Sequence, residues 1–500
     1  MFWSSWSDLV SRTSMKILRA AHEKDDASLS IAVEELCQLP VMSLRRPHRR
    51  GQKGIVQLRH QLDNPALPGS EPFVKERSSN NRISFALKCV RNGKPGKAAR
   101  ALLSAPVLRA SSATTKALTA LHPPPLQDNE ACTYSPGAQF LDPLLVKEVV
   151  RQSRTGSARG PSGWTAELLH PCLDDDTNLE AFCLLFSRLI SGTLPLETRQ
   201  TLTASRLIAL DKGEGKVRPI AIGELFYRLS AKLALRLHKD QIAKALEKHQ
   251  YGVGKPGGME IITHSISYIL QENPDLTCLQ LDFTNAFNSI ERSVVLDVVR
   301  ERLPALYPFV CWSYSCEALL YHEDHTLFSR NGVRQGDPLG PLLFSLGLQP
   351  VLESVGSRHD CLIFAFLDDV YLVGNAEDLE EARCELVEQA SIVSLQFNAL
   401  KSNAFSPQDC SENPFPCSLT GEGMVVLGSP VGNREFCEDF LESALAEHKT
   451  VFDELEPMPS QEAYLLLRFC MVPKVIHLSR LVPSHLFRAF GRRFDRMMLD

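Results

Sequence analysis

Three carboxylates stand at the ends of apolar segments in the middle of the chain. Asp368 and Asp369 lie together between two short apolar runs, and Asp282 closes a third run far upstream. Adjacent carboxylates disfavour each other's ionisation unless a cation lies with them. Their oxygens are the ligands that Mg²⁺ takes, and a pair of such ions stabilises the attacking and leaving oxygens of an in-line phosphoryl displacement. The pattern predicts a two-metal site, with a solvated acidic turn as the alternative.

The apolar runs predict the strands that must bring these acids together. Residues 361–366 and 370–374 predict a tight hairpin that carries the acid pair at its tip. Asp282 belongs to a predicted strand at 278–283, and the segment 376–394 has helical composition with one apolar face. The order of strand, helix, hairpin and helix is typical of a split βαβ, or ferredoxin-like, sheet.

The rest of the chain predicts a mixed α and β organisation. Helical periodicity covers roughly the first forty residues, and the basic segment at 43–54 favours a flexible or partner-ordered connector. Residues 81–103 predict a helix, a Gly/Pro turn and a second helix, and three consecutive prolines within 122–128 predict an extended spacer. Beyond it, helices such as 178–191 alternate with strands such as 205–210.

The charge is distributed unevenly along the chain. Residues 1–125 hold 20 Lys and Arg against 9 Asp and Glu, whereas the remaining residues hold 34 against 50. Such asymmetry indicates contact with nucleic acid, because each neutralised phosphate releases counterions. A solvated linker of ordinary charge is the alternative for the basic part alone.

The composition is that of a globular chain with several cores, at 44% hydrophobic and 23% charged residues over 500 positions. No run reaches the roughly 18–20 apolar residues that span a bilayer, and the amino terminus lacks a signal-peptide pattern. The fourteen cysteines are scattered singly, which favours reduced thiols over a zinc site or a disulfide framework. We expect an intracellular protein, in the nucleus or cytoplasm, that is neither secreted nor membrane-bound.

Eight sequence blocks, covering roughly residues 150–480, resemble in their order the reverse transcriptases of non-LTR (LINE-like) retrotransposons. The blocks are RGPSGWTAELL (159–169), GKVRPIAIGELFYRL (215–229), QYGVG (250–254), LDFTNAFNSI (281–290), NGVRQGDPLGPLLFSL (331–346), AFLDDVYLVG (365–374), LQFNALKS (395–402) and VVLGSPVG (425–432). The chain departs from the family pattern at three positions: Asn288 stands where many relatives have Asp, Leu367 where they more often have Ala, and Ser394, next to the LQFNALKS block, where they usually have Gly.

The resemblance implies an α+β fold with right-hand polymerase architecture: fingers, a ferredoxin-like palm and a helical thumb, preceded by a basic, mainly helical extension. We place the extension and its linker at 1–125, the fingers and palm at 126–435, and a thumb-like helical region at 436–500. The sequence stops within a helical pattern, and we expect a carboxy-terminal portion to be missing.

The resemblance also assigns the chemistry to particular residues. Asp282, Asp368 and Asp369 correspond to the metal-binding catalytic carboxylates, with two Mg²⁺ ions, or Mn²⁺, as cofactors. Lys401 is placed like the lysine that neutralises or protonates the departing pyrophosphate.

The resemblance implies that the blocks around residues 216, 283 and 335 bind the nucleotide. Lys216 and Arg218 are placed like the basic pair that receives the triphosphate, with two surface cations on a hairpin as the alternative. Phe287 matches the ring that excludes a ribose 2′-OH, with simple core packing as the alternative. Phe283, Gln335 and Gly336 complete the implied nucleotide-binding set.

Four further residues have expected roles. Leu427 and Gly428 resemble the primer-gripping hairpin. Arg334, like Gln335, is predicted to contact template or nucleotide, whereas Asp337 favours a helix N-cap over a ligand.

The implied function is RNA-directed DNA synthesis, with an RNA template, a DNA primer or target and deoxynucleoside triphosphates as partners. A catalytically inactive, nucleic-acid-binding remnant of such an element is the first alternative, and a template-directed polymerase that makes RNA is the second. No zinc knuckle, endonuclease or ribonuclease pattern is identified in the sequence.

Overall fold

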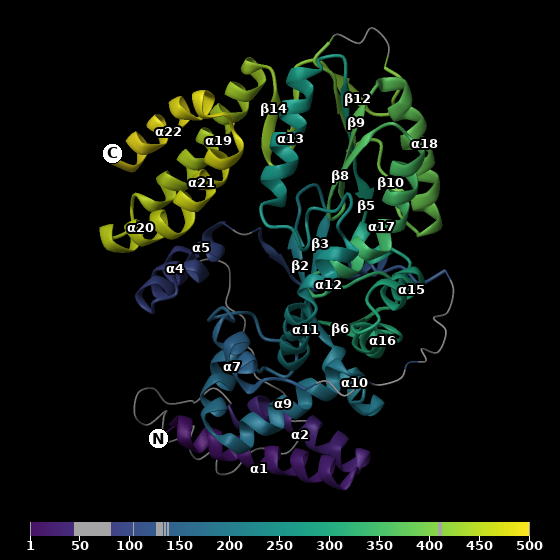
Figure 1. Cartoon of the computed structure of the whole chain (residues 1–500). Helices are drawn as coiled ribbons and strands as arrows, with labels where there is room; N and C mark the ends of the chain where they lie inside the picture. The colour runs from purple at the N-terminus through teal and green to yellow at the C-terminus, as the bar shows by residue number, and fades with distance from the viewer. Residues whose placement is uncertain are drawn as a thin grey trace. The chain divides into compact units, whose positions relative to one another are not determined.

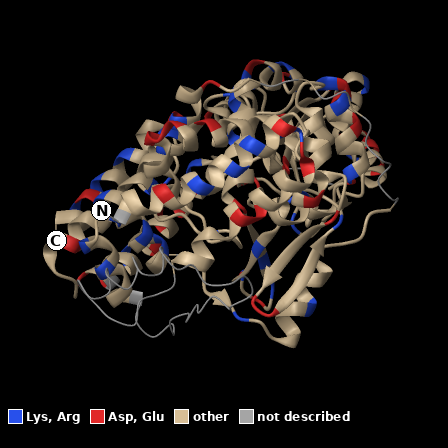
Figure 2. Ribbon diagram, turned by 90° about the horizontal axis from the view of Figure 1, so that it is seen from below, with Lys and Arg blue, Asp and Glu red and all other residues tan. Residues whose placement is uncertain are grey.

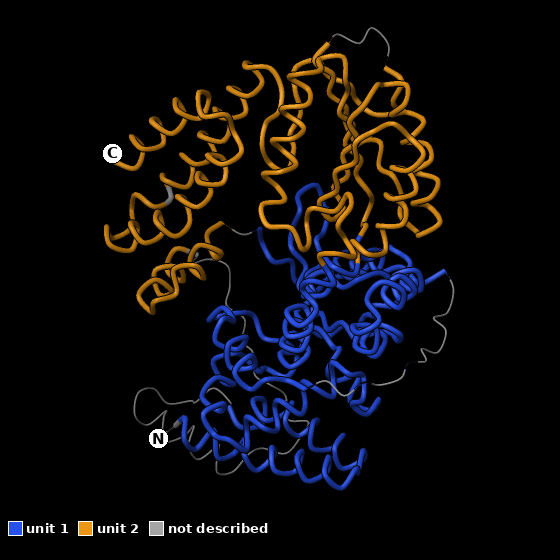
Figure 3. Tube along the Cα trace, viewed as in Figure 1, with its two compact units in different colours: residues 1–77, 105–242, 287–343 blue, residues 78–104, 243–286, 344–500 orange. Residues whose placement is uncertain are grey.

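The computed structural model describes residues 2–44, 82–103, 105–126, 134, 137, 140–408 and 413–499. The chain forms two compact units, each assembled from separate stretches of sequence (Figure 3). Unit 1 comprises residues 1–77, 105–242 and 287–343, and unit 2 comprises residues 78–104, 243–286 and 344–500. The predicted connector at 43–54 lies, from residue 45 onward, outside the described residues.

Unit 1 is built around a mixed five-stranded sheet, in which β1, β2, β6 and β7 follow one another and β3 also pairs with β2. Its elements are α1 (Phe2–Glu23), α2 (Asp26–Ser43), β1 (Val107–Leu108), α6 (Ser112–Ala120), α7 (Pro143–Arg151), α8 (Ala166–Leu169), η1 (His170–Asp174), α9 (Asp176–Ile190), η2 (Leu196–Thr198), α10 (Arg199–Thr203), β2 (Ser205–Asp211), β3 (Val217–Gly223), α11 (Leu225–Leu237), α15 (Arg292–Arg302), α16 (Tyr307–Tyr314), β6 (Ala318–His322) and β7 (His325–Ser329). Three helices cross from one unit's sequence range into the other's: α12 (Lys239–Ala245), α14 (Ala286–Ser289) and α17 (Gly340–Arg358).

The amino-terminal helices α1 and α2 pack against the rest of unit 1. The rings of Trp6 and Trp164 lie 5.3 Å apart, and both tryptophans are fully buried. The indole N–H of Trp164 donates to the Leu36 carbonyl at 2.7 Å, and Ser14 donates to Asn178 at 2.8 Å. Buried indoles with a satisfied N–H bury a large apolar area in a fixed orientation. The first two helices therefore share one core with the segment around Trp164.

Unit 2 contains the predicted split βαβ sheet. Its strand order is β12, β11, β4, β9, β8, and β4 pairs antiparallel with both β9 and β11. Its elements are α4 (Arg82–Arg91), α5 (Pro95–Leu103), α13 (Gly258–Glu272), β4 (Thr277–Leu281), β5 (Phe283–Thr284), β8 (Leu362–Phe366), β9 (Asp369–Gly374), α18 (Ala376–Ile392), β10 (Gln396–Phe397), β11 (Asn403–Phe405), β12 (Ser418–Thr420), β13 (Gly423–Val426), β14 (Ser429–Gly432), α19 (Arg434–Leu455), α20 (Ser460–Leu466), the π-helix η3 (Leu467–Met471), α21 (Val472–Leu481) and α22 (Ser484–Leu499).

Two helices cover opposite faces of this sheet (Figure 1). On one face, Ile262, Ile266 and Leu270 of α13 pack against strand residues that include Cys278 and Tyr371. On the other face lies α18, whose buried positions repeat at helical spacing. These positions are Leu379, Ala382, Leu386 and Ala390. The apolar helical face predicted at 376–394 is confirmed. The sheet therefore has a helix packed on each of its two faces.

The carboxy-terminal helices of unit 2 form a second core. Apolar residues of α19, α21 and α22 meet in one cluster, with Phe490 and Phe494 among its buried members. The hairpin of α4 and α5 packs on α20 through another buried cluster, and Arg91 pairs with Glu462 at 2.7 Å. The predicted helix, turn, helix at 81–103 is confirmed, and so is helical structure from 436 onward. The domain limits at 125 and 435 stay predictions.

Charged residues of both signs are interspersed along the helices (Figure 2). No helix in the described part of the chain is long and apolar enough to cross a membrane. Every cysteine of the described residues is a free thiol.

Candidate active site

The acidic trio lies at one end of the unit 2 sheet. Strands β4 and β9 pair with Leu281 opposite Val370, and continuing this register by one residue sets Asp282 opposite Asp369. Asp368 occupies the tight turn between β8 and β9, where Phe366 pairs with Asp369. Asp369 is thus the first residue of its strand rather than part of the turn. The fold brings together the three carboxylates that the sequence singled out.

The turn that carries Asp368 is held by a buried amide. Leu367 has a φ of +61°, a left-handed conformation that is uncommon for a branched side chain. Gln250, which is fully buried, accepts from the Leu367 N–H at 3.3 Å and donates to the Leu367 carbonyl at 3.2 Å. Bonding at both polar groups of one residue offsets its backbone strain. Leu367 also lies over Gly252, where an added Cβ would come within 3.0 Å of it.

The trio is an electrostatically unfavourable arrangement by itself. Burial, followed by the charges of Asp368 and Asp282, raises the pKa of Asp369 to about 6. Asp282 Oδ2 is buried and has no hydrogen-bond partner among the described residues. A divalent cation would relieve both conditions. In the described part of the chain, no three His, Cys, Asp or Glu side chains are already arranged to hold a metal ion. The metal site therefore stays a prediction.

Lys401 is the cation nearest to this trio that the sequence predicted. Its Nζ lies 3.7 Å from Asp282 Oδ2, and its side chain is half exposed. The loop that carries it also fixes the backbone of Asp282. The Asn398 N–H donates to the Asp282 carbonyl at 2.9 Å, and the Asp282 N–H donates to Ser402 Oγ at 3.0 Å. Lys401 thus pairs with Asp282, and the loop that carries Lys401 is hydrogen-bonded to the Asp282 backbone at two points.

The predicted primer grip forms the turn between β13 and β14. Leu427 and Gly428 both have positive φ, at +48° and +80°. The Leu427 N–H donates to the hydroxyl of Tyr371 at 3.2 Å, and the Gln280 side chain donates to the same hydroxyl at 3.4 Å. Tyr371 lies two residues beyond Asp369 on one strand, so both side chains leave the same face. The hairpin turn is therefore bonded to the strand that carries a catalytic candidate.

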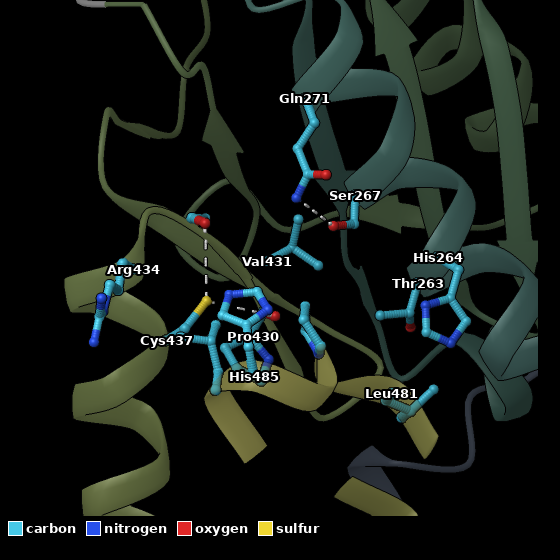
Figure 4. Close-up of a pocket in the computed structure, with 13 residues that line it drawn as sticks. Thr263, His264, Ser267, Gln271, Pro430, Val431, Arg434, Cys437, Leu481 and His485 are labelled. Carbon is cyan, nitrogen blue, oxygen red and sulfur yellow. Dashed lines mark hydrogen bonds between the residues drawn. The ribbon is translucent and has the colours of Figure 1, made fainter. Parts of the chain in front are cut away.

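A cavity of about 200 Å³ lies behind this hairpin, between β14, α13 and the carboxy-terminal helices (Figure 4). Its lining includes Thr263, His264, Arg434 and His485. The Thr263 hydroxyl is buried without a hydrogen-bond partner among the described residues, whereas His264 bonds the Arg480 carbonyl at 2.8 Å. The cavity therefore lies between the β13–β14 hairpin, α13 and the carboxy-terminal helices of unit 2.

The predicted triphosphate-binding cations lie in unit 1, on the hairpin of β2 and β3. Lys216 and Arg218 are both exposed and two residues apart, so they share one face of the hairpin. Lys216 pairs with Glu214 at 2.7 Å, and both side chains are mostly exposed. Surface pairs of this kind exchange readily with other partners. Both cations are accessible to a phosphate, as their predicted role requires.

Phe287, Gln335 and Gly336 also lie together in unit 1. The Val333 N–H donates to the Phe287 carbonyl at 2.7 Å, and the Ala221 N–H of β3 donates to the Gln335 carbonyl at 2.7 Å. Gly336 has a φ of +109°, and an added Cβ would lie 2.5 Å from the Ala221 carbonyl oxygen. Only glycine fits this close approach.

The side chains of Arg334 and Phe283, which the sequence assigned to substrate contacts, are both buried. The prediction that Arg334 reaches template or nucleotide is wrong for this structure, because its side chain is 3% exposed and pairs with Asp337 at 2.9 Å. Asp337 also accepts from the Leu339 N–H at 2.9 Å, so it caps the turn that precedes α17, whereas the helix that it was expected to cap begins at Gly340. The Phe283 side chain is buried, so a nucleotide contact at this residue would involve its backbone.

Sequence reasoning missed the residues that support the acids. Gln250 stood inside a recognised block but had no assigned role, and Gln280 and Tyr371 stood inside strands. A polar residue in the middle of an apolar strand is the signal that could have identified them, since buried polar groups need partners.

Comparison with known proteins identifies the family that part of the chain matches. Residues 210–431 match the family described as reverse transcriptase (RNA-dependent DNA polymerase). A 132 kDa protein of the retrotransposable element SLACS from Trypanosoma brucei gambiense is 29% identical over 283 residues, which are 53% of this chain and 23% of that protein. The Pol polyprotein of the type-1 retrotransposable element R2 from Nasonia vitripennis is 29% identical over 121 residues, which are 22% of this chain and 12% of that protein.

The chain thus spans about a quarter, or less, of the length of these relatives. Among solved structures, apo telomerase of Candida tropicalis, truncated from its C-terminal domain, is similar at a TM-score of 0.36 and 12% identity, covering 46% of this chain and 54% of that one. Telomerase of Candida albicans, in complex with a fragment of telomeric RNA, is similar at a TM-score of 0.36 and 10% identity, covering 47% of this chain and 46% of that one.

Proposed function

We propose, from the premise that this chain carries a reverse transcriptase domain homologous to those of non-LTR retrotransposons, that it extends a DNA primer 3′-OH on an RNA template. The observation that carries the proposal is the acidic trio. Three carboxylates converge on one end of a sheet, where Asp282 Oδ2 has no hydrogen-bond partner in the described part of the chain and the pKa of Asp369 is raised. Uncompensated acids of this kind are typical of functional sites. The right-hand polymerase architecture is part of the same proposal.

The donor set fits a magnesium ion. Asp282, Asp368 and Asp369 would hold it, since Mg²⁺ takes carboxylate oxygens and leaves part of its shell to water and phosphate. When bound, two such ions lower the charge barrier to nucleophilic displacement at the α-phosphate.

The chain's own residues orient the reactants around that chemistry. In this proposal Lys401 neutralises the departing pyrophosphate, which its half-exposed side chain, 3.7 Å from Asp282, supports. Lys216 and Arg218 supply accessible charge for the triphosphate, with the guanidinium able to bond two phosphate oxygens. Phe287 is the candidate ring that excludes a 2′-OH, and the Leu427–Gly428 turn is the candidate support for the primer strand.

Primer extension on poly-rA/oligo-dT with purified protein tests the proposal directly. Wild type should incorporate dTTP in the presence of Mg²⁺ or Mn²⁺, and Asp368→Ala should abolish incorporation. Asp360→Asn is the control, because Asp360 is an exposed acid of unit 2, two residues beyond the end of α17, that has no part in the proposed site. Equal activity of wild type and the Asp368 variant would refute the catalytic assignment.

The two alternatives give different outcomes in the same assay. A remnant that only binds nucleic acid retains an RNA–DNA duplex but incorporates nothing with either metal. A polymerase that makes RNA prefers UTP to dTTP. If Phe287 excludes the 2′-OH, Phe287→Ala should admit UTP, whereas unchanged sugar selectivity would remove that role.

A further inference from the structure

The loop between β7 and α17 carries the predicted nucleotide-contacting pair, Gln335 and Gly336. Residues 331–334 and Asp337 are buried, whereas Gln335 is half-buried and Gly336 is exposed. The loop thus presents two residues outward and directs its charged side chains inward. A loop that buries charge must be held by specific partners, because an unpaired buried charge is costly.

The first half of the loop is held by Arg292, at the start of α15. Its side chain is fully buried and donates to the Gly332 carbonyl at 3.1 Å and to the Asn331 carbonyl at 3.0 Å. Its own N–H donates to the Asn331 side chain at 3.0 Å. Further bonds reach Ser329 Oγ and the Tyr314 carbonyl, at 3.1 and 3.3 Å. One guanidinium therefore joins the loop start to α15 and α16.

The second half is held by the ion pair of Arg334 and Asp337. Asp337 Oδ2 accepts from the Arg334 guanidinium at 2.9 Å and from the hydroxyls of Tyr227 and Tyr314, each at 2.7 Å. The guanidinium also lies over both rings, 4.2 Å from the centroid of Tyr314 and 5.1 Å from that of Tyr227. Tyr227 belongs to α11 and Tyr314 to α16, so three distant segments meet at one carboxylate oxygen.

The exposed turn lies between these two anchors and against β3. The Gln335 carbonyl accepts from the Ala221 N–H, and Gly336 fits against the Ala221 carbonyl. Arg218, the predicted triphosphate ligand, stands three residues before Ala221 on the same strand. A shift of the turn would therefore alter the position of Gln335 relative to that cation.

We propose that Arg292 and the Arg334–Asp337 pair are positioning residues, which fix the Gln335–Gly336 turn so that it binds the incoming nucleotide without reordering. This inference rests on the proposed polymerase function. A preordered turn pays no conformational entropy when the nucleotide binds, so its loss raises KM more than it lowers kcat. Neither arginine contacts a substrate in this assignment; both act through Gln335.

The test combines steady-state primer extension at varied dTTP with hydrogen exchange of the amides of residues 331–340. Asp337→Asn should raise KM for dTTP about tenfold, with kcat within about twofold, and should speed exchange in the loop. Tyr314→Phe and Tyr227→Phe each remove one hydroxyl and should shift KM in the same direction by less. Glu317→Gln is the matched control, since it breaks the exposed Arg330–Glu317 pair at the start of the same loop and should change neither readout.

A double variant separates positioning from general destabilisation. If Asp337 acts through Gln335, then Asp337→Asn should add little to KM once Gln335→Ala is present. The proposal would be overturned if the effects of the two substitutions on KM were fully additive. It would also be overturned if kcat fell at constant KM, or if hydrogen exchange in the loop were unchanged. Should Asp337→Asn fail to fold, the two tyrosine variants decide by the same criteria. A wild-type protein that incorporates no nucleotide defeats the proposed function instead, and the exchange measurement still tests the anchoring of the turn.

Discussion

The two polar clusters of this protein differ in how their charge is compensated. In unit 1, Asp337 is buried with an arginine and two tyrosine hydroxyls bonded to one oxygen. In unit 2, Asp282, Asp368 and Asp369 converge with one half-exposed lysine 3.7 Å away. The unit 1 cluster satisfies its charges with residues of the same chain. In the unit 2 cluster, burial and the neighbouring acids raise the pKa of Asp369, and Asp282 Oδ2 has no hydrogen-bond partner among the described residues.

This difference separates structural from chemical roles. A fully bonded buried network specifies one local conformation, and removal of any member leaves its partners unpaired. Carboxylates that repel one another instead lower stability, and they persist where function requires them. Substitutions in unit 1 should therefore affect stability first, and substitutions in the trio should affect activity first.

The largest expected effect is on activity in the trio. Asp369→Asn should reduce primer extension at least about 10³-fold, the scale of losing a preorganised electrostatic group. The same variant should unfold at an equal or higher temperature than wild type, because it removes a carboxylate whose pKa is raised to about 6 by burial and by two neighbouring acids. Primer-extension assays check the expected loss of activity, and thermal unfolding of the same variant checks the expected stability. A variant that loses activity only because it unfolds would break the comparison.

The opposite behaviour is expected at Arg334. Arg334→Met leaves the Asp337 carboxylate buried without its cation, which should cost about 3–5 kcal/mol of unfolding free energy. Urea denaturation of the full chain measures this cost. Exchange of the exposed Arg330 for Met, in the same loop, should have little effect on stability.

A third polar cluster, which surrounds Glu224 in unit 1, allows the comparison to be tested by a change of pH. Glu224 is buried and accepts from the Ser162 N–H at 2.5 Å, and burial raises its pKa from 4.5 to about 7. Because the folded state favours the protonated form, its contribution to stability is complete below about pH 4.5 and is lost as the pH rises to about 7. Glu224→Gln should therefore match wild type near pH 4 and exceed it by about 3 kcal/mol near pH 8. If the unfolding free energies of the two proteins changed in parallel with pH, this ionisation of Glu224 would be contradicted.

The smallest effect is expected at the surface pair of Lys216 and Glu214. Glu214→Gln should leave the unfolding temperature unchanged, since exposed pairs contribute little to stability. If Lys216 receives the triphosphate, the same variant should lower KM for dTTP slightly, because it frees the ammonium from a competing partner. Lys216→Gln should raise that KM.

Much of the unit 2 sheet could be predicted from the sequence because local signals coincide there. Apolar runs define the strands around the acids, and the tight spacing at 367–369 defines the hairpin. The supporting residues could not be predicted, because their partners are distant in sequence and carry no periodic signal. The bond from Leu427 to Tyr371 is one example, and the pairing of Asp337 with Tyr227 is another.

Arg334 shows the limit of reading charge as exposure. An arginine in a glycine-rich loop next to Gln335 suggests a surface ligand, and only the fold reveals that Asp337 and two tyrosine rings enclose it. Ser394 shows the converse. Its φ is +64°, so the residue stands in a conformation that favours glycine, the residue that the resemblance suggested for this position.

The hairpin of α4 and α5 has a consequence for the order of events during synthesis. Arg91 pairs with Glu462, 371 residues later in the chain. At a translation rate of about 5–20 residues per second, the hairpin leaves the ribosome roughly 20–70 s before its partner exists. For that interval its apolar side, including Ala86, Val90 and Ala98, lacks the surface that later buries it. During that interval the nascent chain exposes an apolar surface next to the basic residues of α4 and α5, which include Lys88, Arg91 and Arg100.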